Sequence, residues 1–425
     1  MLEIQKIRQE KEFIINQLLK VRNIDVSKNI NQIFKLDEEK RATQQLLDSS
    51  SAKMNSLSAS IGEQFKLGNI DHANNLKSQT VDLKEEIKQL KTKFSNLESE
   101  LKSILYEIPN IPHHSVPSGS DESDNEVVHE DNFSKSEFES YLPHWDLCKQ
   151  YNLIDFELGV KITGAGFPVY KGKGAILQRA LIQFFLNEAN ENGFEELLVP
   201  HLVNESSGYG TGQLPDKEGQ MYHVSNENLY LIPTAEVPIT NIYRDIIIDQ
   251  KDLPIKHAGY TPCFRREAGS YGKEVRGLNR LHQFDKVEIV QITDSNSSYR
   301  TLDSMVNYVE SLIKKLNLPY RKLKLCGGDL GFTSALTYDF EVYSVGQNKW
   351  LEVSSVSNFE TFQANRLKLR VRDENKKIKL AHTLNGSALA LPRIMASLLE
   401  FNQTKNGIKI PEILIPYTGF ETIKS

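Results

Sequence analysis

The sequence predicts an α+β fold, in which an antiparallel sheet flanked by helices follows an N-terminal antiparallel α-helical coiled-coil arm. Early in the chain, apolar residues recur at alternating four- and three-residue spacings, as in a helix whose seam faces another helix. After about residue 140, short runs of β-branched and aromatic residues appear with few helical stretches between them. That order favours an antiparallel sheet over a doubly wound parallel one.

Residues 1–110 are predicted to contain the arm, a hairpin of two long helices. The stronger half of the apolar pattern covers residues 76–104, and a weaker series with polar residues at some seam positions covers residues 33–61. Gly68 supplies the turn between them, and Asp71 is expected to cap the second helix. Because the outer faces are polar, we expect the hairpin to project into solvent.

A stripe of lysines flanks the seam of the second predicted helix. Lys77, Lys84 and Lys91 recur every seven residues, and Lys88 lies nearby. Basic and acidic residues nearly balance in this segment. A solvated helix face is the usual meaning of such a stripe, and contact with a nucleic-acid backbone is the alternative.

Residues 111–140 are predicted to be a flexible acidic linker, and residues 141–425 a mixed domain that holds the sheet. Prolines at the start of the linker end the second helix, since proline cannot continue it. Strands are expected at residues 229–233, 286–292, 338–343 and 349–353, and helices at residues 175–190, 299–315 and 388–403.

Composition excludes several classes of protein. The 425 residues are 39% hydrophobic with a net charge of −5, which excludes wholesale disorder and a global basic field. No apolar run is long enough for a membrane-spanning helix, and the charged N-terminus lacks the stretch that a secretory signal needs. The three cysteines lie far apart, so we expect neither a disulfide framework nor a structural zinc site. We expect a cytoplasmic protein with no membrane partner.

A glycine-rich stretch at residues 166–174 superficially matches a phosphate-binding loop. It is one residue too long, and Gly174 stands where such a loop needs a Ser or Thr for magnesium. The glycines at its start follow no predicted strand, so a dinucleotide fingerprint is equally poor. Neither nucleotide-binding interpretation is therefore favoured.

Residues 260–288 form a more informative pattern, in which two extended pieces flank a polar, glycine-rich loop. Arg265 and Glu267 share one strand face at the entry, and Phe284, Lys286 and Glu288 share one face at the exit. Such a surface suits a nucleotide, because arginine neutralises phosphate, a carboxylate accepts from an exocyclic amine, and a ring stacks on a base. The pattern alone leaves a hairpin with a cross-strand ion pair equally open.

This segment resembles motif 2 of the class II aminoacyl-tRNA synthetases, and in detail that of bacterial seryl-tRNA synthetases. Other stretches resemble further elements of that family in the same order: motif 1 at 193–200, the serine-binding element at 234–236, the ATP-binding strand and the segment after it at 348–359 and 362–366, and motif 3 at 382–393. The family also carries an N-terminal coiled-coil arm, so the resemblance covers essentially the whole chain. It implies the class II antiparallel sheet and a homodimer with the motif 1 proline at its interface.

The resemblance implies ATP-dependent activation of L-serine, with Mg²⁺, followed by its transfer to tRNA(Ser). Arg265 would bind the α-phosphate and the serine carboxylate, Glu267 and Phe284 would bind adenine, and Arg393 would stack on its other face and reach the γ-phosphate. Glu352 would hold Mg²⁺, which makes Arg265, Glu352 and Arg393 the catalytic set. The remaining implied ATP-binding residues are Arg266, Val353, Ser354 and Ser355.

The same resemblance implies a buried serine site. Glu236 would receive the ammonium group, Thr234 would line the pocket, and Glu288 and Ser387 would contact the substrate, chiefly its hydroxyl. The implied set is completed by Ala235, Arg265 and Asn385. Buried polar groups reject an amino acid without the hydroxyl, because they would be left unpaired.

The implied tRNA-binding residues are Lys77, Lys84, Lys88 and Lys91 of the arm. They would meet the long variable arm and elbow of tRNA(Ser) through shape and backbone. The tRNA that carries selenocysteine is a second substrate by family analogy. The chain departs from the family pattern at Pro392, where a small residue is usual.

Competing classes make different demands on the sequence. A catalytically silent RNA-binding paralogue is expected to have lost one of the residues Arg265, Glu267, Glu352 and Arg393. A relative that charges a carrier protein is expected to lack the arm. Threonine and proline synthetases append a C-terminal anticodon domain, for which the short stretch after the motif 3 helix leaves no room.

Overall fold

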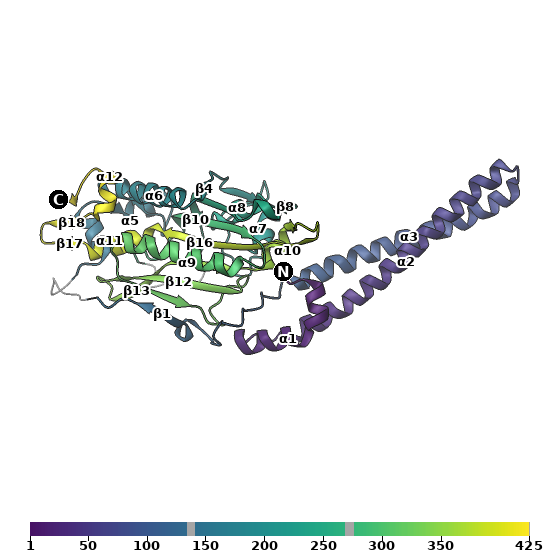
Figure 1. Ribbon diagram of the computed structural model, residues 1–425. Coiled ribbons are helices and arrows are strands. Elements are labelled where there is room, and N and C mark those ends of the chain that lie inside the picture. The colour runs from purple at the N-terminus through teal and green to yellow at the C-terminus, as the bar shows by residue number, and fades with distance from the viewer. Residues whose placement is uncertain (134–140, 268–275, 425) are drawn as a thin grey trace. The chain divides into compact units, whose positions relative to one another are not determined.

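The computed structural model describes residues 1–133, 141–267 and 276–424. The chain divides into two units, one formed by residues 2–19 and 24–109, the other by Met1 with residues 20–23 and 110–425. Figure 1 shows the helices and strands of both units. Among the described residues, no helix combines the length and apolar character needed to cross a membrane.

The first unit is built on two long helices, α2 (Ser27–Lys66) and α3 (Ile70–Leu105), packed side by side (Figure 1). Seam residues such as Ile33 on α2 and Leu97 on α3 are buried. An ion pair of 3.0 Å between Lys40 Nζ and Glu98 Oε1 fixes the antiparallel register. The hairpin expected from the apolar spacing is therefore confirmed.

The turn between these helices differs in one detail from the prediction. Gly68 adopts a left-handed φ of +76°, which glycine reaches without strain. The N-cap of α3 is Asn69, while Asp71 lies inside the first turn of the helix. Asp71 therefore does not cap the helix, but its charge still complements the positive end of the helix dipole.

A shorter helix, α1 (Ile4–Arg22), precedes the hairpin and was not predicted. Within the first unit, Arg8 forms a two-pronged ion pair with Asp37 of α2, at 2.6 Å from Nε to Oδ2 and 2.7 Å from Nη2 to Oδ1. Ile7, Ile14 and Leu18 of α1 are buried. These residues share a helix face, so the periodic signal of the arm extends further towards the N-terminus than the predicted seam.

The second unit contains an eight-stranded sheet, ordered β1-β11-β12-β13-β16-β10-β9-β4. Neighbouring strands are antiparallel from β1 through to β9, and β4 runs parallel to β9. The strands are β1 (Glu126–Glu130), β4 (Glu195–Glu196), β9 (Ile255–Phe264), β10 (Gln283–Thr293), β11 (Tyr320–Lys324), β12 (Leu336–Ser344), β13 (Lys349–Asn358) and β16 (His382–Ala390).

Helices cover this sheet, as the sequence predicted. In Figure 1, α9 (Ser298–Lys315) and α11 (Leu391–Phe401) lie across strands of the sheet, and α6 (Gly172–Glu191) packs on β9 and β10. On α9, Leu302, Val309 and Leu312 recur on one face and are buried in the main core.

Three expected elements need correction. The helix predicted to begin at residue 388 begins at Leu391, because residues 388–390 end β16. The strand near residue 229, β7 (Leu229–Leu231), lies in a separate three-stranded sheet with β5 (Leu202–Asn204) and β6 (His223–Val224). The predicted linker contributes β1. A short edge strand needs no buried face, so β1 shows no alternating apolar pattern.

Candidate active site

An irregularity in β13 determines which of its side chains face the same way. Glu341 of β12 pairs with Glu352, whereas the next residue back, Phe340, pairs with Ser354, so Val353 is an extra residue in the ladder. Such a bulge turns the side chains on one side of it by one position. Glu352 and Ser355 therefore lie together, and Ser355 Oγ donates to Glu352 Oε1 at 3.3 Å.

The same bulge buries the two residues between them. Val353 belongs to the main apolar core, and Ser354 Oγ donates a 2.6 Å hydrogen bond to the main-chain oxygen of Ser387. Of the four predicted ATP-binding residues on β13, Glu352 and Ser355 thus present accessible side chains, whereas those of Val353 and Ser354 support the strand from within.

Arg393 lies in the first turn of α11, beside Glu352. Its Nη1 donates to the main-chain oxygen of Glu352 at 2.7 Å and lies 3.5 Å from Glu352 Oε2. Its Nε donates to the main-chain oxygen of Asn279 at 3.0 Å. Pro392 occupies the start of the helix, where its missing N–H removes no helical bond. The departure at Pro392 is therefore compatible with an Arg393 that reaches Glu352.

Arg265 and Phe284 come together across neighbouring strands. Cys263 near the end of β9 pairs with Phe284 of β10. Two residues after Cys263, the guanidinium of Arg265 lies 5.2 Å from the centre of the Phe284 ring. Arg265 Nε also donates to the main-chain oxygen of Pro233 at 3.3 Å. Arg265 and Phe284 thus lie on one surface, as the strand pattern predicted, and a cation–π contact between them was not part of that prediction.

β9 ends at Phe264 and Glu267 has a φ of +48°, so Arg265 and Glu267 do not share a strand face as strand alternation predicted. Glu267 Oε2 lies 3.1 Å from Arg280 Nε, and the side chain of Glu267 is mostly shielded. Arg266 is exposed and donates its main-chain N–H to the main-chain oxygen of Gln220 at 2.8 Å. The structure therefore gives Glu267 an arginine partner, while the predicted glycine-rich loop lies largely outside the described residues.

A buried polar cluster adjoins Arg265 and is centred on Glu288 of β10. Thr234 Oγ1 donates to Glu288 Oε2 at 2.7 Å, and Asn385 Nδ2 donates to Glu288 Oε1 at 3.1 Å. Lys286 Nζ forms an ion pair with Glu288, and Ser387 pairs opposite Glu288 in the sheet. The structure thus brings together Thr234, Glu288, Asn385 and Ser387, as predicted from segments far apart in the sequence.

Glu236 adds a second buried carboxylate to this cluster. It begins α8 (Glu236–Asn241), and Gln363 Nε2 donates to Glu236 Oε1 at 2.6 Å. Burial, and then the charge of Glu288, raise the pKa of Glu236 to about 7. The positive charges of Lys286 and Arg265 oppose this rise in the pKa of Glu236 without cancelling it, so a further cationic group beside Glu236 would be favourable.

Ala235 is the predicted serine-site residue whose side chain lies elsewhere. Its methyl group is fully buried with Ile239 and Val290 in a small apolar cluster. In a tight segment between two polar residues, the small side chain lets the chain pack against β10. The side chain of Ala235 therefore does not face the predicted serine site, and only its main chain can contribute there.

Strand alternation already placed Lys286 between Phe284 and Glu288 on one strand face, but no role at the site was predicted for it. Two further residues at this site had no predicted role either. Gln363 and Asn279 contact Glu236 and Arg393 from segments distant in the sequence. No local pattern points to those two contacts, because only the tertiary fold creates them.

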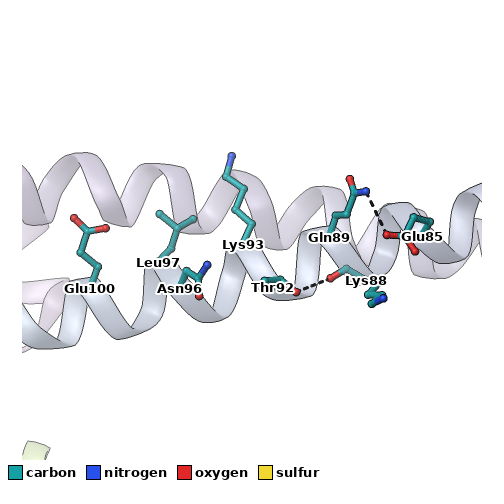
Figure 2. A pocket seen from close by; sticks show the side chains of 8 residues that line it. All are labelled: Glu85, Lys88, Gln89, Thr92, Lys93, Asn96, Leu97 and Glu100. Atoms are coloured by element: carbon teal, nitrogen blue, oxygen red, sulfur yellow. Dashed lines mark hydrogen bonds between the residues drawn. The ribbon is translucent and has the colours of Figure 1, made fainter.

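The predicted arm lysines Lys77, Lys84, Lys88 and Lys91 are exposed along α3. Lys88 borders a surface hollow of about 520 Å³ on this helix, shown in Figure 2. Glu85, Lys93 and Glu100 line the same hollow, and Gln89 Nε2 donates to Glu85 Oε1 at 3.4 Å. The surface therefore mixes both signs of charge.

Comparisons with known proteins agree with this architecture. Residues 1–112 match the seryl-tRNA synthetase N-terminal domain, and residues 222–402 match the tRNA synthetase class II core domain (G, H, P, S and T). A serine–tRNA ligase of Salinibacter ruber is 47% identical, with 100% of this chain and 99% of that protein covered. One from Akkermansia muciniphila is 44% identical with the same coverage.

Solved structures give the same result. The seryl-tRNA synthetase from Pyrococcus horikoshii complexed with ATP has a TM-score of 0.91 at 33% identity, and the match covers 100% of this chain and 99% of that one. The cytoplasmic serine–tRNA ligase from Naegleria fowleri in complex with AMP has a TM-score of 0.85 at 26% identity, with the same coverage. The resemblance seen in the sequence motifs is thereby confirmed: the chain belongs to the bacterial-type seryl-tRNA synthetases, within the class II aminoacyl-tRNA synthetases.

Proposed function

We propose that the chain activates L-serine with ATP to form seryl-adenylate and then transfers the seryl group to tRNA(Ser). The main support for this proposal is that Arg265 lies next to the cluster of buried carboxylates. Arg265 Nε bonds to the main chain of Pro233, and the next residue, Thr234, donates to Glu288. A guanidinium suited to a phosphate thus adjoins a buried polar cluster suited to an amino acid. Relatives named serine–tRNA ligase support the same substrate.

In the activation step, an oxygen of the serine carboxylate attacks the α-phosphorus of ATP. A phosphorus–oxygen bond forms, the bond to the bridging oxygen breaks, and pyrophosphate leaves. The carboxylate is already ionised at neutral pH, so no general base is needed. Two anions must approach in line, so we assign Arg265 to neutralise charge and Arg393 to hold the distal phosphate.

The serine pocket follows from the two buried carboxylates. We assign Glu236 to the substrate ammonium group, because the pKa of this buried carboxyl stays raised despite Lys286 and Arg265, so a further cation bound beside it would be stabilised. Glu288, Thr234, Asn385 and Ser387 then provide the polar surroundings of the hydroxyl. An alanine substrate would leave those groups unpaired, which is how such a site discriminates strongly.

Glu352 and Ser355 are the residues that we propose hold Mg²⁺. Their carboxylate and hydroxyl oxygens are the hard donors that this ion prefers. The Glu352 side chain is 48% exposed and therefore reachable by a hydrated ion. Bound there, Mg²⁺ supplies positive charge to the phosphates. We assign Phe284 and Glu267 to the adenine ring, with Arg266 at the edge of the same surface.

We also propose a homodimer. Leu198, in the motif 1 segment that follows β4, is 86% exposed, an unusual exposure for a large apolar side chain beside an edge strand. A second copy that covers this edge would remove both the apolar surface and the unpaired strand. The arm is assigned to tRNA(Ser) and, by family analogy, to the tRNA for selenocysteine. A cytoplasmic location follows from these partners.

Pyrophosphate exchange into ATP tests this function. We expect L-serine to stimulate exchange by at least about tenfold over each of the other nineteen amino acids, because the pocket pairs with the serine hydroxyl. Reactions without any amino acid give the background. Exchange that no amino acid stimulates, or that another amino acid stimulates more strongly, would contradict the proposal.

The raised pKa of Glu236 predicts how serine binding depends on pH. Below about pH 7 this carboxyl becomes protonated and loses the charge that pairs with the ammonium group. The KM for serine should therefore rise as pH falls through 7, approaching tenfold per pH unit. The KM for ATP, measured in the same exchange reactions, serves as the internal control.

The variant Glu236→Gln identifies the group responsible. Its amide cannot titrate, so we expect a high KM for serine that no longer changes between about pH 6 and pH 8. A wild-type KM for serine that is flat across this range would remove Glu236 from the titration. An equally steep slope in Glu236→Gln would assign the titration to another group.

A further inference from the structure

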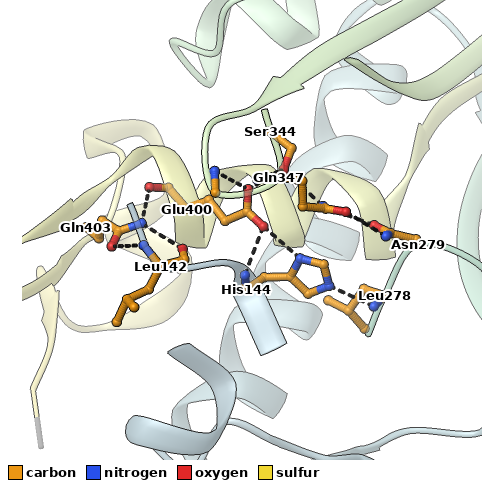
Figure 3. A network of polar contacts seen from close by, with 9 residues as sticks. Leu142, His144, Leu278, Asn279, Ser344, Gln347, Glu400 and Gln403 are labelled. Atoms are coloured by element: carbon orange, nitrogen blue, oxygen red, sulfur yellow. Dashed lines mark hydrogen bonds and ion pairs between the residues drawn. The ribbon is translucent and has the colours of Figure 1, made fainter. Parts of the chain in front are cut away.

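A buried His–Glu pair lies behind the proposed ATP site. Figure 3 shows His144, the first residue of α4 (His144–Gln150), against Glu400 near the end of α11. Both side chains are fully buried. The Glu400 carboxylate accepts from His144 Nδ1 at 2.8 Å, from the His144 N–H at 2.9 Å, from the Gly346 N–H at 3.0 Å and from the Ser344 hydroxyl. Its lone pairs are therefore well satisfied without a cation.

The second ring nitrogen of His144 binds a different segment. The main-chain N–H of Leu278 donates to His144 Nε2 at 2.9 Å. Because Nε2 accepts this bond, the ring proton resides on Nδ1, where it is donated to Glu400. The neutral imidazole thus ties α11 to the chain that returns after the glycine-rich loop. Gly277 permits the approach, since a Cβ at that position would collide with Nε2.

Asn279, which follows Leu278 in the chain, connects the His144–Glu400 pair to Arg393. Its side chain exchanges two hydrogen bonds with Gln347, of 2.7 Å and 3.2 Å, and Gln347 Nε2 donates to Ser344 Oγ at 2.9 Å. Since the Ser344 hydroxyl donates to Glu400, the bonds close into a ring (Figure 3). The main-chain oxygen of Asn279 then accepts from Arg393 Nε at 3.0 Å.

We propose that His144 is a positioning residue for ATP, acting through Leu278 and Asn279 on Arg393. This inference rests on the proposed function of Arg393. Arg393 and Glu400 are seven residues apart and lie on one side of α11. The closed set of hydrogen bonds therefore holds Leu278 and Asn279 against α11 at two places, near Glu400 through His144 and at Arg393 directly. Without the acceptor at Nε2, the Asn279 oxygen is free to shift, and Arg393 loses one of its two main-chain anchors.

Two variants of His144 separate its two hydrogen bonds. In His144→Asn the side-chain amide reaches close to the position of Nδ1, so this variant keeps a donor for Glu400 and removes the acceptor for Leu278. The longer His144→Gln places an amide oxygen near the position of Nε2 and restores that acceptor. We expect His144→Asn to lower kcat/KM for ATP in serine-dependent exchange by about a hundredfold, since displacements near 1 Å have effects of this size.

The distribution of the effect distinguishes positioning from folding. For His144→Asn we expect the KM for ATP to rise while the KM for serine changes less than about twofold. Among the residues that the structure describes, the hydrogen bonds around His144 and Glu400 do not include any residue of the serine cluster. His144→Gln should recover at least about tenfold of the loss. Thermal unfolding of both variants reports their stability independently of these constants.

Gln403→Ala is the matched control at the outer end of the same network. Gln403 bonds to the main chain of Leu142 and Glu400 but to neither Leu278 nor Asn279. We expect this variant to keep both KM values. A wild-type KM for ATP in His144→Asn, or equal changes for ATP and serine, would overturn the proposal. Absence of serine-dependent exchange in the unmodified protein would instead overturn the proposed function itself.

Discussion

Replacement of Arg265 by alanine is expected to lower serine-dependent ATP–pyrophosphate exchange by at least about 10³-fold. The guanidinium lies over the Phe284 ring and donates to the main chain of Pro233, the residue before Thr234 of the serine cluster. In our assignment, Arg265 is therefore the residue that contacts both the serine carboxylate and the α-phosphate. Its loss leaves the attacking carboxylate and the α-phosphate to repel each other. The measurement is the initial rate of labelled pyrophosphate incorporation at saturating ATP and serine.

Lysine at the same position separates charge from geometry. Arg265→Lys keeps the positive charge but loses the planar, two-pronged donor, so we expect only partial recovery of exchange. Arg372→Ala is the control for a general loss of surface charge. Arg372 pairs with Asp249 at 3.3 Å in a separate small sheet, and its removal should leave exchange unchanged. Wild-type exchange in Arg265→Ala would remove Arg265 from the mechanism.

Much of the fold could be predicted from local periodicity. The seam of α3 repeats every seven residues, and the long central strands alternate or are continuously apolar, so the sequence predicted both kinds of element. The edge strand β1 could not, because Val127 and Val128 are both exposed and leave no buried face to detect. The bulge at Val353 was also invisible, since one inserted residue in a ladder depends on the partner strand.

The site divides in the same way. Arg265, Phe284 and Glu288 belong to one strand–loop–strand segment, so their common surface follows from strand alternation. The contacts of Thr234 and Asn385 with Glu288 join distant segments, and the family motifs, not the residue pattern, pointed to them. Gln363 lies in the family-like segment at residues 362–366, but nothing in that segment pointed to its contact with Glu236. Tertiary contacts between single polar residues leave no periodic trace in a sequence.

Truncation of the arm is expected to separate the two steps of the reaction. Lys40 pairs with Glu98 and Ser50 with Glu86, so Leu46 and Lys91 lie nearly opposite each other on the two helices. Removing residues 47–90 and joining these ends by a short glycine-rich loop keeps the buried contacts of Ile33 with the base of the hairpin. Exchange should stay within about twofold of wild type, while kcat/KM for tRNA(Ser) falls at least about a hundredfold.

Substitutions within the full-length arm then identify the surface that is used. Replacing the exposed stripe of α3 with alanine, at Lys77, Lys84, Lys88 and Lys91, should raise the KM for tRNA(Ser) and flatten its dependence on salt. The logarithmic slope should fall by up to about 0.7 to 0.9 for each phosphate that is no longer neutralised. Alanine at Lys28, Lys35, Lys53 and Lys66, four exposed lysines of α2, is the matched removal of charge from the other helix.

The three measurements together discriminate among the possible roles of the hairpin. If exchange and transfer fall equally in the truncated protein, the arm supports the fold and does not select tRNA. If the α2 variant loses as much salt dependence as the α3 variant, the general charge of the arm matters and the stripe does not. The remaining outcome is that the truncated protein loses only transfer to tRNA and that only the α3 variant loses salt dependence. That outcome requires a nucleic acid bound along this face of α3, because its phosphates couple binding to counterion release.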